Sequence, residues 1–167
     1  MSAAALAVFT LARAVAGAAS AAPRIGATDG RLVIALPDFL PGDPDDATLA
    51  RALTQGVAQA LTQNGRLALV DSTLMSGLTI VVDTVPDFTP WRAIGARALV
   101  TGLVSMQAGR IRAGFRVWDT AAGLQLIGQM YRATPEQAPE LARVIAAAIV
   151  ERLAGKREGT APLRKLL

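Results

Sequence analysis

The feature that most constrains the fold is a run of three consecutive strand patterns between residues 98 and 131. The middle pattern, RIRAGFRVWD at 110–119, alternates apolar and polar residues. Because successive side chains of a strand point to opposite faces, one face of this strand is expected in a core and the other in solvent. The core-facing residues are Ile111, Ala113, Phe115 and Val117. A turn at Ala108–Gly109 and another in DTAAG predict an antiparallel meander.

Two longer helices are expected around this meander. The first begins after a cap at Asp45 or Asp46 and stops at Asn64–Gly65. Its buried stripe is predicted to be Leu49, Leu53, Val57, Ala60 and Leu61. The last helix has Thr134 as its cap, Pro135 in its first position and Gln137 as a capping-box partner, and it ends at Gly155. Its buried stripe is predicted to be Leu141, Val144, Ile145, Ala148, Ile149 and Leu153.

The remaining segments predict shorter elements. The nearly continuous apolar run RLVIALPDF indicates a central strand buried on both faces, and RLALVD a second short strand. Residues 72–88 are consistent either with a strand at Thr79–Val82 or with an extended crossing segment. A short helix follows, with Thr89 as its cap and Pro90 in its first position. We therefore expect one α/β domain, with a mixed five-stranded sheet and two main helices packed on one face.

The charge pattern argues against nucleic acid as a partner. The chain has 167 residues and a net charge of +4. Residues 22–155, however, hold 12 basic and 12 acidic residues, so the excess lies in the terminal segments. A neutral domain is poorly suited to neutralising a phosphate backbone.

The chain has no cysteine and no histidine, which excludes disulfides, cysteine nucleophiles and every histidine-dependent triad. No phosphate-binding glycine loop or nucleophile elbow is found. The acidic residues Asp43, Asp45 and Asp46 precede a helix, where capping explains them. We expect no enzyme, and no catalytic, cofactor-binding, metal-binding or small-molecule site.

Arg110, Arg112, Arg116 and Trp118 lie on the polar face of the alternating strand. That face is interpreted either as a solvated outer surface or as a surface for a protein partner, since arginine and tryptophan are common interface residues. Trp91 and Arg92 are interpreted as packing and surface groups, with Trp91 at the edge of the core.

The ends of the chain predict export. Residues 1–21 are apolar and small, and they finish in an A-x-A-like site at Ala19–Ala21, as in a signal peptide. Residues 22–31 are expected to form a flexible arm, residues 32–155 the folded domain and residues 156–167 a disordered tail. The expected location is the periplasm.

Three ordered sequence blocks resemble the N-terminal domain of the TolB family. They are WRAIGARALVTGLV, RIRAGFRVWDTAAGLQLIGQMY and AAAIVERLAGKRE. The residues that match the family pattern are Trp91, Arg92, Gly95, Ala98, Leu99, Val100 and Gly102; Phe115, Arg116, Trp118, Asp119, Gly123 and Leu126; and Ile149, Glu151, Leu153 and Gly155. The resemblance spans residues 24–156.

This resemblance implies a periplasmic binding protein of the Tol-Pal system, which maintains outer-membrane integrity and its constriction at division. It implies that the N-terminal arm engages the inner-membrane protein TolA. Arg24 and Ile25 are the only residues of the arm that match the family's TolA-binding segment, so they are the candidate contact residues. In the family a C-terminal β-propeller binds the lipoprotein Pal. No propeller sequence follows the domain here, so Pal binding is not expected. A truncated, non-functional TolB fragment and another cell-envelope α/β adaptor domain are the alternatives.

Overall fold

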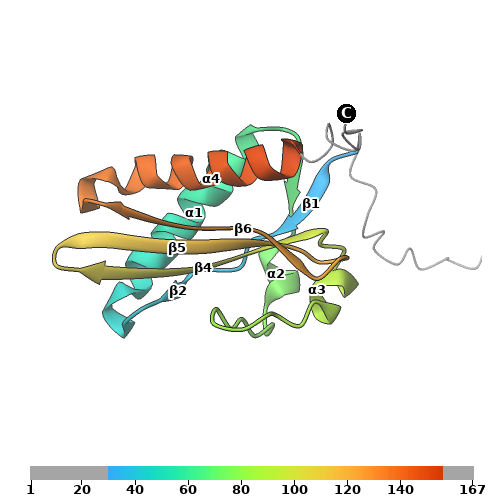
Figure 1. Cartoon of the computed structure of the whole chain (residues 1–167), viewed down its shortest axis with the longest axis horizontal. Helices are drawn as coiled ribbons and strands as arrows, with labels where there is room; N and C mark the ends of the chain where they lie inside the picture. The colour runs from blue at the N-terminus through green and yellow to red at the C-terminus, as the bar shows by residue number, and fades with distance from the viewer. Residues whose placement is uncertain (1–29, 156–167) are drawn as a thin grey trace, which may run out of the picture.

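The computed structural model describes residues 30–155 (Figure 1). The strands are β1 (Leu32–Ala35), β2 (Leu40–Pro41), β3 (Leu67–Leu69), β4 (Ala98–Gln107), β5 (Arg110–Asp119) and β6 (Leu124–Ala133). The helices are α1 (Ala47–Gln63), α2 (Ser72–Met75), α3 (Thr89–Ala93) and α4 (Ala138–Gly155). Single 3-10 turns, η1 (Pro44–Asp46) and η2 (Pro135–Gln137), lead into α1 and α4. The predicted signal peptide, all but the end of the predicted arm, and the predicted tail lie outside the described residues.

The strands form one mixed sheet in the order β3-β1-β4-β5-β6. Strand β1 is parallel to both β3 and β4, whereas β4, β5 and β6 form the predicted antiparallel meander. The tight turn between β4 and β5 places Ala108 at φ 49° and Gly109 at φ 72°, the left-handed geometry that two-residue hairpin turns require. Because α1 and α4 lie together on one face (Figure 1), the predicted α/β fold with a mixed sheet and two main helices is confirmed.

The structure adds a sixth strand to the five expected. The strand predicted at RLVIALPDF ends already at Ala35, and the chain returns to the sheet just after this run as β2, which pairs with β4 at Leu40 and Leu103. Between the two strands, Phe39 turns its ring onto Gly102, where an added Cβ would lie 2.6 Å from the ring. Pro37 lacks an N–H to donate to a strand ladder, which favours the break.

The larger core lies between the sheet and the pair α1 and α4. Ile34, Val100 and Val117 from three strands meet Val57 and Ile145 from the two helices, all with no exposed surface. The capping box before α4 is confirmed, since the Thr134 N–H donates to Gln137 Oε1 at 3.0 Å. Before α1, the carboxylate of Asp46 accepts hydrogen bonds from the N–H groups of Asp43 and Met106, so it ties the turn to β4.

One prediction for α4 was wrong. Val144 is 39% exposed, whereas Ala142 and Ala146 are buried in its place. The reason is the close contact of α4 with α1: a Cβ on Gly56 would lie only 2.9 Å from the Cβ of Ala142. Because both residues are small, the two helices can pack closely there. This close packing rotates α4 so that its buried stripe faces α1.

A second, smaller core lies on the opposite face of the sheet. Trp91 of α3 and Trp118 of β5 pack there with Phe88, Leu99 and Ala35. Residues 76–88 cross below the sheet without forming a strand, so the alternative of an extended crossing segment is correct. The helical turn α2 was not expected; the Asp71 carboxylate caps it by accepting the Thr73 N–H at 2.8 Å.

Candidate partner-binding surfaces

The predicted contact residues Arg24 and Ile25 lie outside the described residues. The described chain begins at Gly30 and enters the sheet at Leu32, whose N–H donates to the carbonyl of Arg66 at 3.1 Å. The described chain thus enters the sheet through β1, which lies between β3 and β4.

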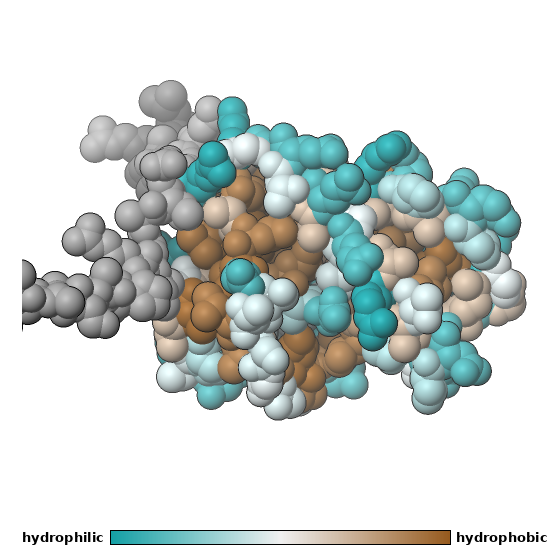
Figure 2. Space-filling view, turned by 180° about the vertical axis from the view of Figure 1, so that it is seen from behind, coloured by the Kyte–Doolittle hydropathy of each residue, from teal (hydrophilic) through white to brown (hydrophobic). Residues whose placement is uncertain are grey.

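Apolar surface is exposed near this point. Figure 2 shows apolar side chains gathered toward the end of the molecule where β1 begins, and hydrophilic side chains separate them from a smaller apolar area. Within the described residues, β3 pairs only with β1, so the outer edge of this short strand carries free backbone groups.

The second surface is the part of the sheet that the small core leaves open. It consists of the β4, β5 and β6 side chains that point away from α1 and α4. Cross-strand register aligns these side chains in rows: Thr101 with Arg116 and Gly128, Leu103 with Gly114 and Met130, and Ser105 with Arg112 and Arg132. We call this surface the open sheet face.

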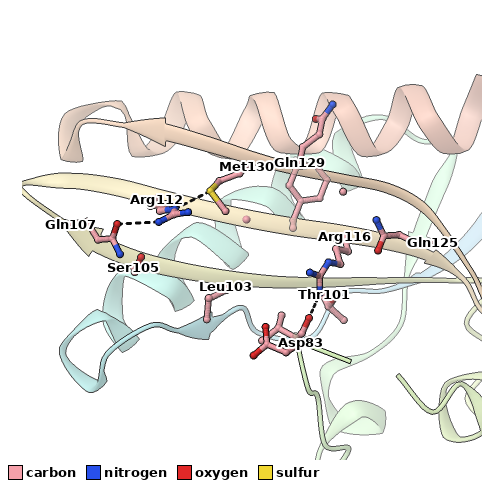
Figure 3. A pocket seen from close by; sticks show the side chains of 14 residues that line it. Asp83, Thr101, Leu103, Ser105, Gln107, Arg112, Arg116, Gln125, Gln129 and Met130 are labelled. Carbon is pink, nitrogen blue, oxygen red and sulfur yellow. Dashed lines mark hydrogen bonds between the residues drawn. The ribbon is translucent and has the colours of Figure 1, made fainter. Parts of the chain in front are cut away.

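The open sheet face is hollowed into a groove of about 580 Å³ (Figure 3). Val82 and Asp83 of the crossing segment border it on one side, and the three strands form its floor. Apolar side chains are exposed on it, with Leu103 at 39% and Met130 at 55%. The groove is therefore a mixed surface, with hydrocarbon at its centre and polar side chains around it.

Two arginines reach across the groove from β5. The Arg112 Nε donates to Met130 Sδ at 2.9 Å, and its Nη1 donates to Gln107 Oε1 at 3.2 Å. Arg116 Nη1 donates to the carbonyl oxygen of Val82, which ties the crossing segment to the sheet. All three acceptors are uncharged.

Trp118 lies on the same face of the sheet as the arginines, as predicted, but the expectation that this end of the face is polar was wrong. Trp118 is 5% exposed; its ring lies against Phe88 with centroids 5.9 Å apart, and its Nε1 donates to Thr101 Oγ1 at 3.1 Å. The alternation alone could not show this, because residues 72–93 cover that end of the face. Trp91 is 1% exposed, so it packs in the core as expected.

The cap of α3 also differs from the expected one. Asp87 Oδ1, not the side chain of Thr89, caps the first turn by accepting the Thr89 N–H at 2.9 Å. Hydrogen bonds from the Thr89 backbone and hydroxyl hold the pKa of Asp87 below the ordinary aspartate value. Thr73 lowers the pKa of Asp71 at α2 in the same way.

Among residues 30–155, no three His, Cys, Asp or Glu side chains are grouped to hold a metal ion. No helix in the described part of the chain is long and apolar enough to cross a membrane. The groups that the groove does bring together are guanidinium, amide, hydroxyl and hydrocarbon. They can hold a ligand by hydrogen bonds, charge and apolar contact.

A family model described as the TolB amino-terminal domain matches residues 25–126, more than half of the 167 residues. The chain belongs to this family. The resemblance carried by Trp91, Gly102 and Trp118 is thereby confirmed, while the third sequence block, at 149–155, lies beyond the matched residues.

The fold is similar to that of TolB from Acinetobacter baumannii. The TM-score is 0.60 and the identity 18%, over 76% of this chain and 29% of that chain. This chain thus spans less than a third of that TolB. The similarity to the lipoprotein GNA1162 from Neisseria meningitidis is lower, with a TM-score of 0.47 and 14% identity over 75% of this chain and 96% of that chain. The LpoB C-terminal domain from Salmonella enterica has a TM-score of 0.45 and 15% identity over 63% of this chain and 83% of that chain.

The sequence pattern indicates Arg112 and Arg116 as outward-facing residues but not the rest of the groove. Leu103 and Met130 were read only as strand residues, and Val82 and Asp83 lay in the segment without a clear pattern. One signal was available: Gly114 and Gly128 interrupt neighbouring strands, and glycines in strands often mark close approach of another group.

Proposed function

We propose that this chain is a periplasmic protein-binding component of the Tol-Pal system of the cell envelope. In this proposal its N-terminal arm, residues 22–31, binds a TolA-like inner-membrane protein, with Arg24 and Ile25 making the contacts. The binding contributes to outer-membrane integrity and to constriction during division. Export through a signal peptide at residues 1–21 places the domain in the periplasm.

The observation that carries the proposal is the family match, which supports association with the Tol-Pal system and begins at Ile25. The absence of histidine and cysteine from the sequence favours binding over catalysis. The arm would leave the domain beside an exposed sheet edge, where an extended segment can pair with, or dock on, a partner. We expect an arm of about ten residues to lose conformational freedom on binding, so its own affinity should be modest.

A pull-down with the C-terminal domain of TolA tests the arm. The mature chain is compared with a chain that lacks residues 22–31 and with an Arg24→Ala, Ile25→Ala double variant. Thr28→Ala serves as the matched control, because it changes the arm without touching the two contact candidates. We expect the deletion and the double variant to lose binding and the control to keep it. Equal capture of the intact and deleted chains would refute the arm as the binding segment.

A further inference from the structure

The open sheet face carries four arginines that form no ion pair with any described residue. Within residues 30–155, none of Arg110, Arg112, Arg116 and Arg132 forms an ion pair; the one found joins Arg143 to Glu140 on α4. In the described part of the chain, Asp83 is the only carboxylate that lines the groove. The described residues hold equal numbers of arginines and carboxylates, 11 of each by count. The positive charge of this face is therefore local, on a fold that is neutral as a whole.

The two arginines in the groove have a defined spacing. Arg112 and Arg116 lie four residues apart on β5, on the same face. At a rise of about 3.3–3.4 Å per residue, their Cα atoms are roughly 13 Å apart. An extended peptide has the same repeat. Two acidic side chains four residues apart on such a peptide would meet the two guanidinium groups in register.

The floor between the two arginines is apolar. Gly114 lies midway between them and pairs with Leu103 on one side and Met130 on the other. The glycine is not needed for close packing, since an added Cβ would lie 3.7 Å from the nearest side-chain atom, Met130 Cε. The space above Gly114 can therefore receive a side chain from a bound peptide.

The guanidinium groups of Arg112 and Arg116 have more N–H donors than the hydrogen bonds found for them use. Each arginine offers five N–H donors, and carboxylates are the strongest partners for them. Arg112 uses two donors on a thioether and an amide oxygen, and Arg116 uses one on a carbonyl oxygen (Figure 3). A carboxylate would replace or join these neutral acceptors with a charge-assisted bond.

We propose that the open sheet face binds an extended acidic peptide segment of a partner protein. The segment lies along β5, with acidic residues at its first and fifth positions against Arg112 and Arg116. An apolar residue at its third position contacts Leu103, Gly114 and Met130. The terminal segment 156–167 of this chain is excluded as the occupant by its charge, because it holds four basic residues and one acidic residue. This site is separate from the arm, and the proposal does not depend on TolA binding.

Fluorescence anisotropy of the intact mature chain tests the proposal. The probe is a fluorescein-labelled peptide with the central sequence Glu-Ser-Leu-Ser-Glu, and its isomer Glu-Glu-Leu-Ser-Ser has the same composition without the spacing. We expect the first peptide to bind about fivefold more tightly, since one charge pair is lost in the isomer. Higher salt should weaken binding, because the arginines are partly exposed.

Three variants examine the groove. Arg112→Gln and Arg116→Gln should each weaken binding about fivefold, by the loss of one charge pair. Arg51→Gln on α1 is the matched control, since it removes an equal charge from an exposed site on the other side of the sheet and should not alter binding. Gly114→Val fills the floor without changing charge and should abolish binding. Thermal melts establish that each variant is folded.

The outcomes separate the proposal from its alternatives. Equal binding of the two peptides, or equal binding by the chain and its Gly114→Val variant, would overturn it. A single-stranded DNA 20-mer and vesicles of anionic phospholipid are tested alongside. Tighter binding of either one, weakened by the same arginine variants, would show that the face binds phosphate and would equally overturn the peptide assignment. Deletion of residues 22–31 should leave peptide binding unchanged, so failure here is distinguishable from failure of the proposed TolA contact.

Discussion

Replacing Gly102 by alanine should destabilise the fold by crowding Phe39. An added Cβ would lie 2.6, 2.8 and 2.9 Å from three atoms of the Phe39 ring, closer than carbon atoms pack. The ring is 2% exposed and lies between β4 and α1, so it has little space to move away. Overpacking of this kind costs about 1–3 kcal/mol, and three contacts below 3.0 Å place Gly102→Ala in the upper half of that range.

Gly114→Ala on β5 is the matched control. Its new Cβ meets nothing closer than 3.7 Å, so it should gain the roughly 0.5–1 kcal/mol that alanine has over glycine in a strand. The same gain applies at Gly102, so it cancels when the two variants are compared. The difference between their free energies of unfolding is therefore the cost of crowding at Gly102 alone, about 2–3 kcal/mol. Urea unfolding, followed by tryptophan fluorescence, measures both free energies of unfolding. Equal stabilities for the two variants would show that the Phe39 ring does not crowd a side chain at position 102.

Three further predictions concern stability. Thr54→Val should cost about 1–3 kcal/mol by urea unfolding, because the buried Thr54 Oγ1 accepts the Phe39 N–H at 2.9 Å and valine leaves that donor unpaired; Thr54→Ser should cost less. Ala108→Asn should stabilise the hairpin turn, raising the free energy of unfolding by about 0.5–1 kcal/mol, since asparagine tolerates φ 49° better than alanine; an unchanged value would contradict this. The lowered pKa of Asp87 means that its contribution is present above the ordinary aspartate pKa and is lost as pH falls through the lowered value. Asp87→Asn should therefore be less stable than the wild type at pH 6, and the difference in unfolding midpoint should shrink below about pH 4; a difference independent of pH would argue against the cap.

Hydrophobic periodicity predicted the helices and strands that have one buried face and one solvent-exposed face. The meander, α1, α4 and the Thr134 capping box were predictable because local pattern and final environment agree. Contacts between distant segments were not. Phe39 packs on Gly102 and not in the strand predicted for it, which ends at Ala35, and the contact of Ala142 with Gly56 turns the buried stripe of α4. Both contacts join residues more than 60 positions apart.

The candidate site was predictable in part for the same reason. The alternation on β5 identified Arg112 and Arg116 as outward-facing, and the structure places both in the groove. It could not show that Trp118, on the same predicted face, lies under Phe88. Whether an outward residue meets solvent depends on the crossing segment 76–88, whose own pattern is weak.

The TolA contact is tested most directly by an NMR titration of the isotope-labelled mature chain with the C-terminal domain of TolA. Resonances of every backbone amide are followed, so the binding segment is located without mutation. We expect the amides of residues 22–31 to shift or broaden, including that of Ile25, and those of α1 and α4 to stay unchanged. Saturating additions of TolA that leave residues 22–31 unperturbed would rule out the arm as its binding segment.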